Sequence, residues 1–193
     1  MDGDEGRVAV MRKWTLAGAA LLVGAAGALA EPLTLTSPDL SPGARIGALQ
    51  VGDRFGCAGG NRSPTLVWSG APAGAKSFAI SLFDPDAPTG AGFWHWALFD
   101  IPASATSLPS GAGDPEAAVA PPGAVAGRND AGTIGYFGPC PPEGDKPHRY
   151  RFELDALDVA HVGLQAGAAA ASVAERVRRH TLAKATLIGI WSR

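Results

Sequence analysis

Residues 76–83 read Lys-Ser-Phe-Ala-Ile-Ser-Leu-Phe, so large apolar side chains alternate with small or polar ones. A strand with one buried face has this period of two, because successive side chains point to opposite sides of a sheet. The stretch therefore predicts a β-strand that turns Phe78, Ile80 and Leu82 toward the core.

A second alternating stretch lies downstream, at 94–99. The period of two places Trp94, Trp96 and Leu98 on one face of the predicted strand and His95 on the opposite face. We therefore expect His95 to point away from both tryptophans.

Further strands are predicted at 149–156, where apolar and charged residues alternate, and over the shorter stretches 33–36 and 66–68. The 193 residues include 26 glycines and 16 prolines. Both residue types disfavour helix interiors, which excludes a helical bundle and favours short strands joined by turns. The sequence predicts a mainly β fold.

One helix is predicted near the C-terminus. Ser172 and Glu175 have the spacing of a capping box, in which the hydroxyl accepts a backbone hydrogen bond and the carboxylate reaches back. We expect a helix over 173–185 with its arginines spread around a solvated surface, followed by a last strand over 186–191.

The N-terminal 30 residues have the order of a secretory signal peptide. Two basic residues precede the uncharged stretch 14–30, which is rich in Ala, Leu and Gly and closes on Ala-Leu-Ala. Such a leader is cleaved after its small residues, and the stretch is short for a membrane span, which needs about 20 apolar residues. We predict a leader at 1–30, a folded domain at 31–193 and a periplasmic or secreted location. A retained anchor is the alternative.

The chain contains two cysteines, Cys57 and Cys140. Export would place them in an oxidising compartment, where paired thiols close. We therefore predict a Cys57–Cys140 disulfide. Two free buried thiols and half of a metal site are the competing interpretations, although no closely spaced cysteine pair supports zinc.

The overall charge argues against one class of partner. The formal net charge is −2, from 16 basic and 18 acidic residues. Nucleic-acid binding depends on neutralising phosphates, so this balance predicts no nucleic-acid partner. Any anion has to be bound by a local arrangement of side chains.

Two histidines lie beside stiff, proline-containing loops: His95 follows the loop 84–90, and His148 follows the loop 138–147. Strand ends beside such loops are where a scaffold displays ligand-binding groups. Three interpretations stay open from these residues alone: structural histidines, a ligand site, and a metal site of two histidines and one carboxylate. The sequence contains no nucleophile-elbow, P-loop or zinc-protease motif.

Four short motifs follow one another along the chain: Asp84-Pro85-Asp86-Ala87-Pro88, Gly92-Phe93-Trp94-His95-Trp96, Gly138-Pro139-Cys140-Pro141-Pro142 and His148-Arg149-Tyr150. Together they resemble the phosphatidylethanolamine-binding protein family, most closely its bacterial branch of Raf-kinase-inhibitor-like proteins. The resemblance covers 33–193.

The resemblance implies a large central antiparallel sheet, a smaller second sheet and helical elements at the C-terminus. It also implies a small pocket for phosphate, acetate or phosphoethanolamine-type groups, with no metal and no cofactor. Carried over position by position, the ligand-binding residues are Asp84, Asp86, Pro88, His95, Gly138, Pro142, His148 and Tyr150. Two positions depart from the family pattern: Ala131 replaces an aromatic residue, and Phe137 replaces a glycine beside the pocket mouth.

The resemblance favours a non-catalytic protein that binds a small anionic ligand or a phospholipid head group, retains no membrane span, and regulates a protein partner as a further role. Two alternatives stay open. The 109–132 loop, rich in Gly, Pro and Ala, could act as an inhibitory or interaction surface. The aspartates and histidines could instead hydrolyse a phosphoester by acid–base catalysis, although no nucleophile or metal motif supports an enzyme.

Overall fold

The chain is described here by a computed structural model that covers Met1 and residues 31–193. These residues form β1 (Thr34–Thr36), β2 (Leu66–Ser69), β3 (Ser77–Asp84), β4 (Phe93–Pro102), β5 (Ser107–Leu108), β6 (Val125–Ala126), β7 (His148–Leu157), α1 (Ala170–Arg178) and β8 (Thr181–Trp191). The predicted leader and its cleavage site fall on residues outside this description. Over the part of the chain that is covered, no helix is long and apolar enough to cross a membrane.

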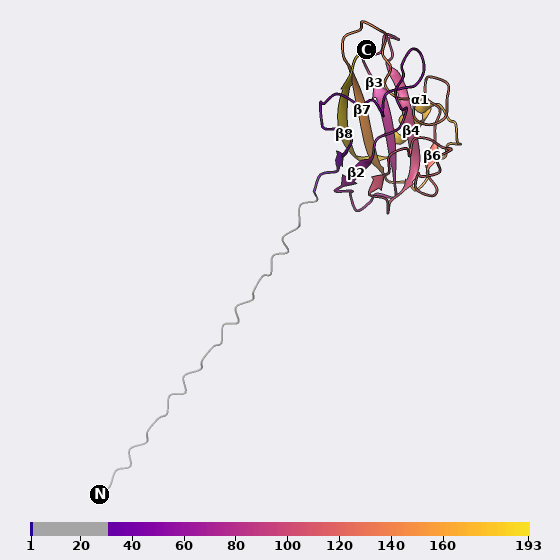
Figure 1. Cartoon of the computed structure of the whole chain (residues 1–193). Coiled ribbons are helices and arrows are strands. Elements are labelled where there is room, and N and C mark those ends of the chain that lie inside the picture. The colour runs from indigo at the N-terminus through magenta and orange to yellow at the C-terminus, as the bar shows by residue number, and fades with distance from the viewer. Residues whose placement is uncertain (2–30) are drawn as a thin grey trace.

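The strands form two antiparallel sheets, which confirms the predicted mainly β fold. The larger sheet has the strand order β6-β4-β3-β7-β8, and the smaller has the order β1-β2-β5. Figure 1 shows the five strands of the larger sheet side by side, with α1 beside β4. The central strand, β3, pairs with β4 along one edge and with β7 along the other.

The larger sheet buries side chains on both faces. Phe78, Ile80 and Leu82 of β3 lie in one core cluster with Trp68 of the smaller sheet, as their alternation predicts. Val173 of α1 belongs to a second cluster, which covers the opposite face. Because each large apolar side chain contributes about 1.5–3 kcal/mol when fully buried, these two layers hold the sheet in place.

The helix prediction was wrong at both ends. The helix α1 begins before the predicted range 173–185 and ends well short of residue 185. Ser172 lies inside the helix, and the N-cap residue, Ala169, makes no side-chain capping bond. Glu175 instead accepts hydrogen bonds from Arg178 of the last helical turn and from the C-cap residue Arg179. The capping-box spacing was therefore a coincidence of sequence.

The residues beyond α1 join the last strand, which begins at Thr181 rather than at residue 186. The long strand β7 explains this difference, since it pairs with β8 along its whole length, from His148 opposite Trp191 to Leu157 opposite Thr181. The edge of β7 offers backbone hydrogen bonds that a longer helix would have left unmade.

Candidate functional site

Three chain segments meet at one end of the larger sheet. The strand β3 ends at Asp84, whereas β4 begins at Phe93 and β7 begins at His148. Because β3 is antiparallel to both neighbours, its last residues lie beside their first ones, as the pairing of Asp84 with Phe93 shows. The topology therefore gathers residues from three of the four sequence motifs in one place.

A buried histidine–aspartate pair lies at the centre of this region. His148 Nδ1 is 2.7 Å from Asp84 Oδ2, and the two side chains are 1% and 3% exposed. His148 Nε2 lies 3.3 Å from a carboxylate oxygen of Asp145, and Asp84 Oδ1 accepts the backbone N–H of Asp86 at 2.8 Å. A buried carboxylate needs such partners because burial alone penalises its charge.

His95 reaches the same region through a β-bulge. Trp94 and Trp96 pair with adjacent residues of β3, so His95 has no partner residue in that strand. A bulge turns neighbouring side chains out of strict alternation. Trp96 lies in the main core, whereas Trp94 packs against the cluster on the α1 side of the sheet. The expectation that the two tryptophans share a face was therefore wrong.

The bulge places the buried imidazole of His95 against three aromatic rings, of which Phe93 is the nearest at a 4.7 Å centroid distance. The ring lies parallel to Phe137, with a 5.7 Å centroid distance, and edge-on to Tyr150 at 5.3 Å. Its Nδ1 lies 2.8 Å from the Phe137 carbonyl oxygen. Burial lowers the pKa of His95 to about 4, and this hydrogen bond and the carboxylate of Asp84 offset the shift only in part.

Tyr150 lies beneath both histidines. Its side chain is fully buried, and its ring stacks near His148 at a centroid distance of 6.3 Å. The hydroxyl makes no hydrogen bond of full geometry within the described part of the chain, although the carboxylate of Asp84 lies close enough to interact with it. Burial, with a smaller contribution from the carboxylate of Asp84, raises the pKa of Tyr150, so the hydroxyl keeps its proton and remains a donor.

A pocket of about 360 Å³ opens above these side chains. Of the predicted ligand-binding residues, the following line it: Asp84, Pro88, His95, Pro142 and His148. The remaining lining residues are Phe55, Ala87, Thr89, Phe93, Asp130, Ala131, Phe137, Cys140 and Pro141. The pocket thus combines a small polar floor with walls of phenylalanine and proline.

Three predicted residues lie outside the lining. Tyr150 is below the floor, and the carboxylate of Asp86 is bound by the guanidinium of Arg149. Gly138 packs behind the pocket, where a Cβ would overlap the carbonyl oxygen of Gln50. Glycine is therefore required there by the close approach of two backbones.

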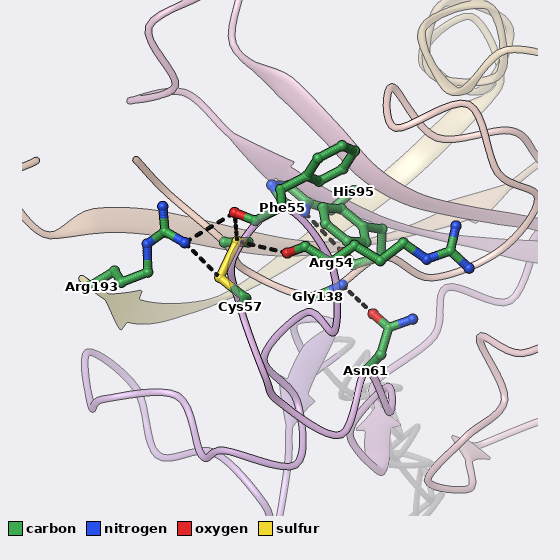
Figure 2. Close-up of a disulfide and its surroundings, with 9 residues drawn as sticks. Arg54, Phe55, Cys57, Asn61, His95, Gly138 and Arg193 are labelled. Carbon is green, nitrogen blue, oxygen red and sulfur yellow. Dashed lines mark hydrogen bonds between the residues drawn. A yellow bond between two sulfur atoms is a disulfide. The ribbon is translucent and has the colours of Figure 1, made fainter. Parts of the chain in front are cut away.

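A loop that sequence reasoning missed forms part of the pocket mouth. Phe55 lines the pocket although it is 67% exposed and has a φ of 54°, in the left-handed region that costs a non-glycine residue about 1–2 kcal/mol. Figure 2 shows its backbone carbonyl accepting a hydrogen bond from Arg193, at 3.0 Å. Cys57 was the sequence signal that could have identified this loop. Its predicted disulfide partner, Cys140, lies in the proline-rich loop already assigned to the pocket, so the residues beside Cys57 were expected near the pocket as well.

The predicted disulfide is confirmed. It joins Cys57 to Cys140 and so ties the Phe55 loop to the proline-rich pocket loop (Figure 2). A second link runs beside it, since the Gly138 N–H donates to Asn61 Oδ1 at 2.8 Å. The two links hold the pocket mouth in one conformation. Separately, residues 31–193 contain no cluster of three or more histidine, cysteine or acidic side chains able to hold a metal ion.

Comparison with known proteins agrees with these observations. The family model described as phosphatidylethanolamine-binding protein matches residues 36–192. The UPF0098 protein YbcL of Escherichia coli is 43% identical over 164 residues, which cover 85% of this chain and 90% of YbcL. YbhB of the same organism is 41% identical over 160 residues, which cover 83% of this chain and 100% of YbhB.

One solved structure and one further relative in sequence are also similar to this chain. The crystal structure of E. coli YbcL, described as a new member of the mammalian PEBP family, has a TM-score of 0.82 at 42% identity and covers 84% of this chain and 99% of its own. LppC of Mycobacterium tuberculosis, named as a candidate lipoprotein, is 38% identical over 160 residues, covering 83% of this chain and 72% of LppC.

Proposed function

This chain belongs to the phosphatidylethanolamine-binding protein family, and we propose that it is a non-catalytic protein that holds a small anionic ligand between Asp84, His95 and His148. The ligand class comprises phosphate, phospholipid head groups and small carboxylates. The observation that carries this proposal is the hydroxyl of Tyr150. This buried donor makes no hydrogen bond of full geometry, and a ligand oxygen that reached the floor between the two histidines would give it one.

The walls of the pocket support an organic anion rather than a bare ion. Phe55, Phe93 and Phe137 lie on its lining together with three prolines. Aromatic and apolar walls around a few polar groups are typical of small-molecule sites, where the polar groups orient the ligand. In this arrangement the polar floor binds the anionic group of the ligand, and the apolar walls contact its hydrocarbon substituent.

Calorimetric titration tests the proposal with phosphate, phosphoethanolamine and acetate. We expect saturable binding, weakened at least about tenfold in His148→Ala, because a ligand oxygen that replaces the half-exposed Asp145 at His148 Nε2 gains a donor worth about 1.5–3 kcal/mol. His161→Ala, a substitution on an exposed side chain remote from the pocket motifs, is the matched control. If His148→Ala fails to fold, Tyr150→Phe serves in its place. An absence of heat with all three compounds in the folded protein would rule the proposal out.

The hydrolase alternative draws on the same Asp84–His148 pair, which lies within the range required for acid–base work. A panel of generic phosphoesters, with and without divalent metal ions, separates the two functions. Turnover that disappears in His148→Ala would replace the binding-only proposal. We expect binding without turnover.

We also propose that the protein works outside the cytoplasm. The predicted leader at 1–30 and the Cys57–Cys140 disulfide are typical of exported proteins, and the relative LppC bears a lipoprotein name. Mass spectrometry of the protein from a cell fractionation gives the test. We expect a periplasmic or secreted form that begins at Glu31 and contains no free thiol.

The 109–132 loop supports regulation of a protein partner as a second candidate role. It borders an open groove of about 920 Å³ that also includes the exposed side chain of Ile134. A pull-down that survives substitution of His95 and His148 but fails after shortening of the loop would favour this role over ligand binding.

A further inference from the structure

We infer that the pocket selects the singly protonated form of a phosphate monoester, and that Nε2 of His95 accepts the hydrogen bond from the P–OH group of this ligand. The inference rests on the proposed anion pocket. It adds which form of the anion is bound and which residue distinguishes that form from others.

The first step is the tautomer of His95. Its Nδ1 lies 2.8 Å from the carbonyl oxygen of Phe137, and a carbonyl oxygen can only accept a hydrogen bond. The proton of a neutral ring is therefore on Nδ1, and Nε2 carries a lone pair. The carbonyl of Gly138 also lies near the ring, but among the described residues the one hydrogen bond of full geometry is that at Nδ1. Since His95 lines the pocket, Nε2 is the ring nitrogen left for a ligand, and it offers that ligand an acceptor rather than a donor.

The second step is the charge of this ring. The titratable groups that face it are Asp84 on β3, Asp130 on the loop after β6, and His148 and Tyr150 on β7. The two carboxylates favour an imidazolium, but burial outweighs them and holds the pKa of His95 at about 4. The ring is therefore neutral at ordinary pH, and its lone pair is available.

The remaining polar groups of the lining are also mostly acceptors. Asp84 accepts hydrogen bonds at both oxygens, from His148 and from a backbone N–H. Asp130 accepts the N–H of Trp94 at 2.8 Å. Among the residues of the pocket lining no lysine or arginine occurs. A doubly charged phosphate would therefore face two carboxylates and a lone pair, whereas a ligand with its own O–H donor matches His95.

A phosphate monoester supplies this donor in a pH-dependent way. Its second pKa is about 6, so the singly charged form, with one P–OH group, predominates below that value. A phosphate diester carries the same single charge but has no O–H group. Comparing the two esters therefore shows whether binding requires an O–H donor on the ligand or only a single negative charge.

The test is calorimetric titration of the full-length protein with methyl phosphate and dimethyl phosphate at pH 5, 6, 7 and 8. We expect the affinity ratio of monoester to diester to fall by about 90-fold from pH 5 to pH 8, as the protonated fraction of the monoester falls. Taking the ratio cancels the titration of protein groups that act on both esters alike, and His95, with a pKa of about 4, stays mostly neutral over this pH range.

A ratio that stays constant while both esters bind would overturn the inference and leave the proposed anion pocket intact. Stronger binding of the diester than of the monoester at pH 5 would do the same. Failure of both esters to bind at any pH would instead remove the proposed function itself. Vesicles containing phosphatidic acid, a lipid monoester, form a third arm: binding with the same pH dependence assigns the ligand to a membrane, and binding of methyl phosphate alone assigns it to solution.

His95→Asn provides the matched variant, because its amide can still donate to the Phe137 carbonyl but places no acceptor at the position of Nε2. We expect its affinity for methyl phosphate at pH 5 to fall by about tenfold, with the affinity for dimethyl phosphate little changed. His180→Asn, on a ring paired with Asp158 at the surface, is the control. If His95→Asn does not fold, the ring nitrogens of the unsubstituted protein are observed by NMR at pH 6, and a proton on Nε2 of His95 would overturn the inference.

Discussion

Arg149 and Asp86 form a bidentate ion pair at the start of β7, with the guanidinium Nε and Nη2 each 2.9 Å from a different carboxylate oxygen. The backbone N–H of Arg149 donates to the same carboxylate, also at 2.9 Å. These bonds tie the loop after β3 to β7 and keep the Asp86 carboxylate on Arg149. The side-chain hydrogen bond from Arg149 lowers the pKa of Asp86 well below its ordinary value.

We predict that Asp86→Asn destabilises the fold at neutral pH and that the difference from the unsubstituted protein narrows as the pH falls from 4 to 2.5. A lowered pKa means that the pair contributes stability above the unfolded value of about 3.9 and loses it as the pH falls through the folded value. Urea unfolding at pH 7, 4 and 2.5 measures the two midpoints. Glu175→Gln, at an exposed helical pair, is the control, and a gap for Asp86→Asn that is constant with pH would contradict the prediction.

Two buried tyrosines allow a paired test of the pocket floor. Tyr136 donates to the carbonyl oxygen of Gln50 at 2.7 Å, whereas the hydroxyl of Tyr150, near the carboxylate of Asp84, makes no hydrogen bond of comparable geometry in the described residues. We expect Tyr136→Phe to lower the free energy of unfolding by about 1 kcal/mol, and Tyr150→Phe to leave it unchanged or raise it. We also expect Tyr150→Phe to weaken phosphate binding. Thermal unfolding with and without phosphate measures both effects, and equal destabilisation by the two substitutions would count against an unpaired hydroxyl.

The disulfide is expected to stabilise both the fold and the pocket mouth. It closes a separation of 83 residues, and removing it costs about 4 kcal/mol in the chain-entropy model. Urea unfolding with and without a reductant measures this cost, and the double variant Cys57→Ser, Cys140→Ser should be insensitive to reductant. Phosphate should also bind more weakly once the Phe55 loop is released. Unchanged affinity after reduction would show that the loop holds its position without the bond.

Burial of His95 predicts a distinct acid response. Its folded pKa of about 4 lies below the unfolded value of about 6.5, so the unfolded state binds more protons between the two. Stability should therefore decline as the pH falls through this window, by about 3 kcal/mol in total. His95→Asn should lack this part of the decline. NMR titration of the ring gives a direct check, and a midpoint near 6.5 for His95 would refute the assignment.

The main strands could be predicted from alternation because a half-buried sheet imposes a period of two on its residues. The disulfide could be predicted because a chain expected to be exported, with two cysteines, has one pairing to form. The end of the helix could not be predicted, because the residue types around Thr181 are compatible with either a helix or a strand. Pairing with β7 makes these residues a strand, and this pairing joins residues that are far apart in the chain.

The site divides in the same way. The residue types of the pocket floor were evident in the motifs around Asp84, His95 and His148, because those motifs are local. Whether each side chain reaches the pocket was not evident, since it depends on contacts between segments. Such contacts produce the bulge at His95, the ion pair between Asp86 and Arg149, and the position of the Phe55 loop at the pocket mouth.

The sequence by itself thus determined the main strands, the residue types of the site and the cysteine pair, all of which depend on residue type and local period. Only the tertiary structure decided which nitrogen of His95 is free, which carboxylate is already neutralised and which aromatic ring lines the pocket mouth. The physical reason is that hydrogen-bond partners and burial are properties of neighbours in space, and these neighbours are brought together by the pairing of β3 with β4 and β7.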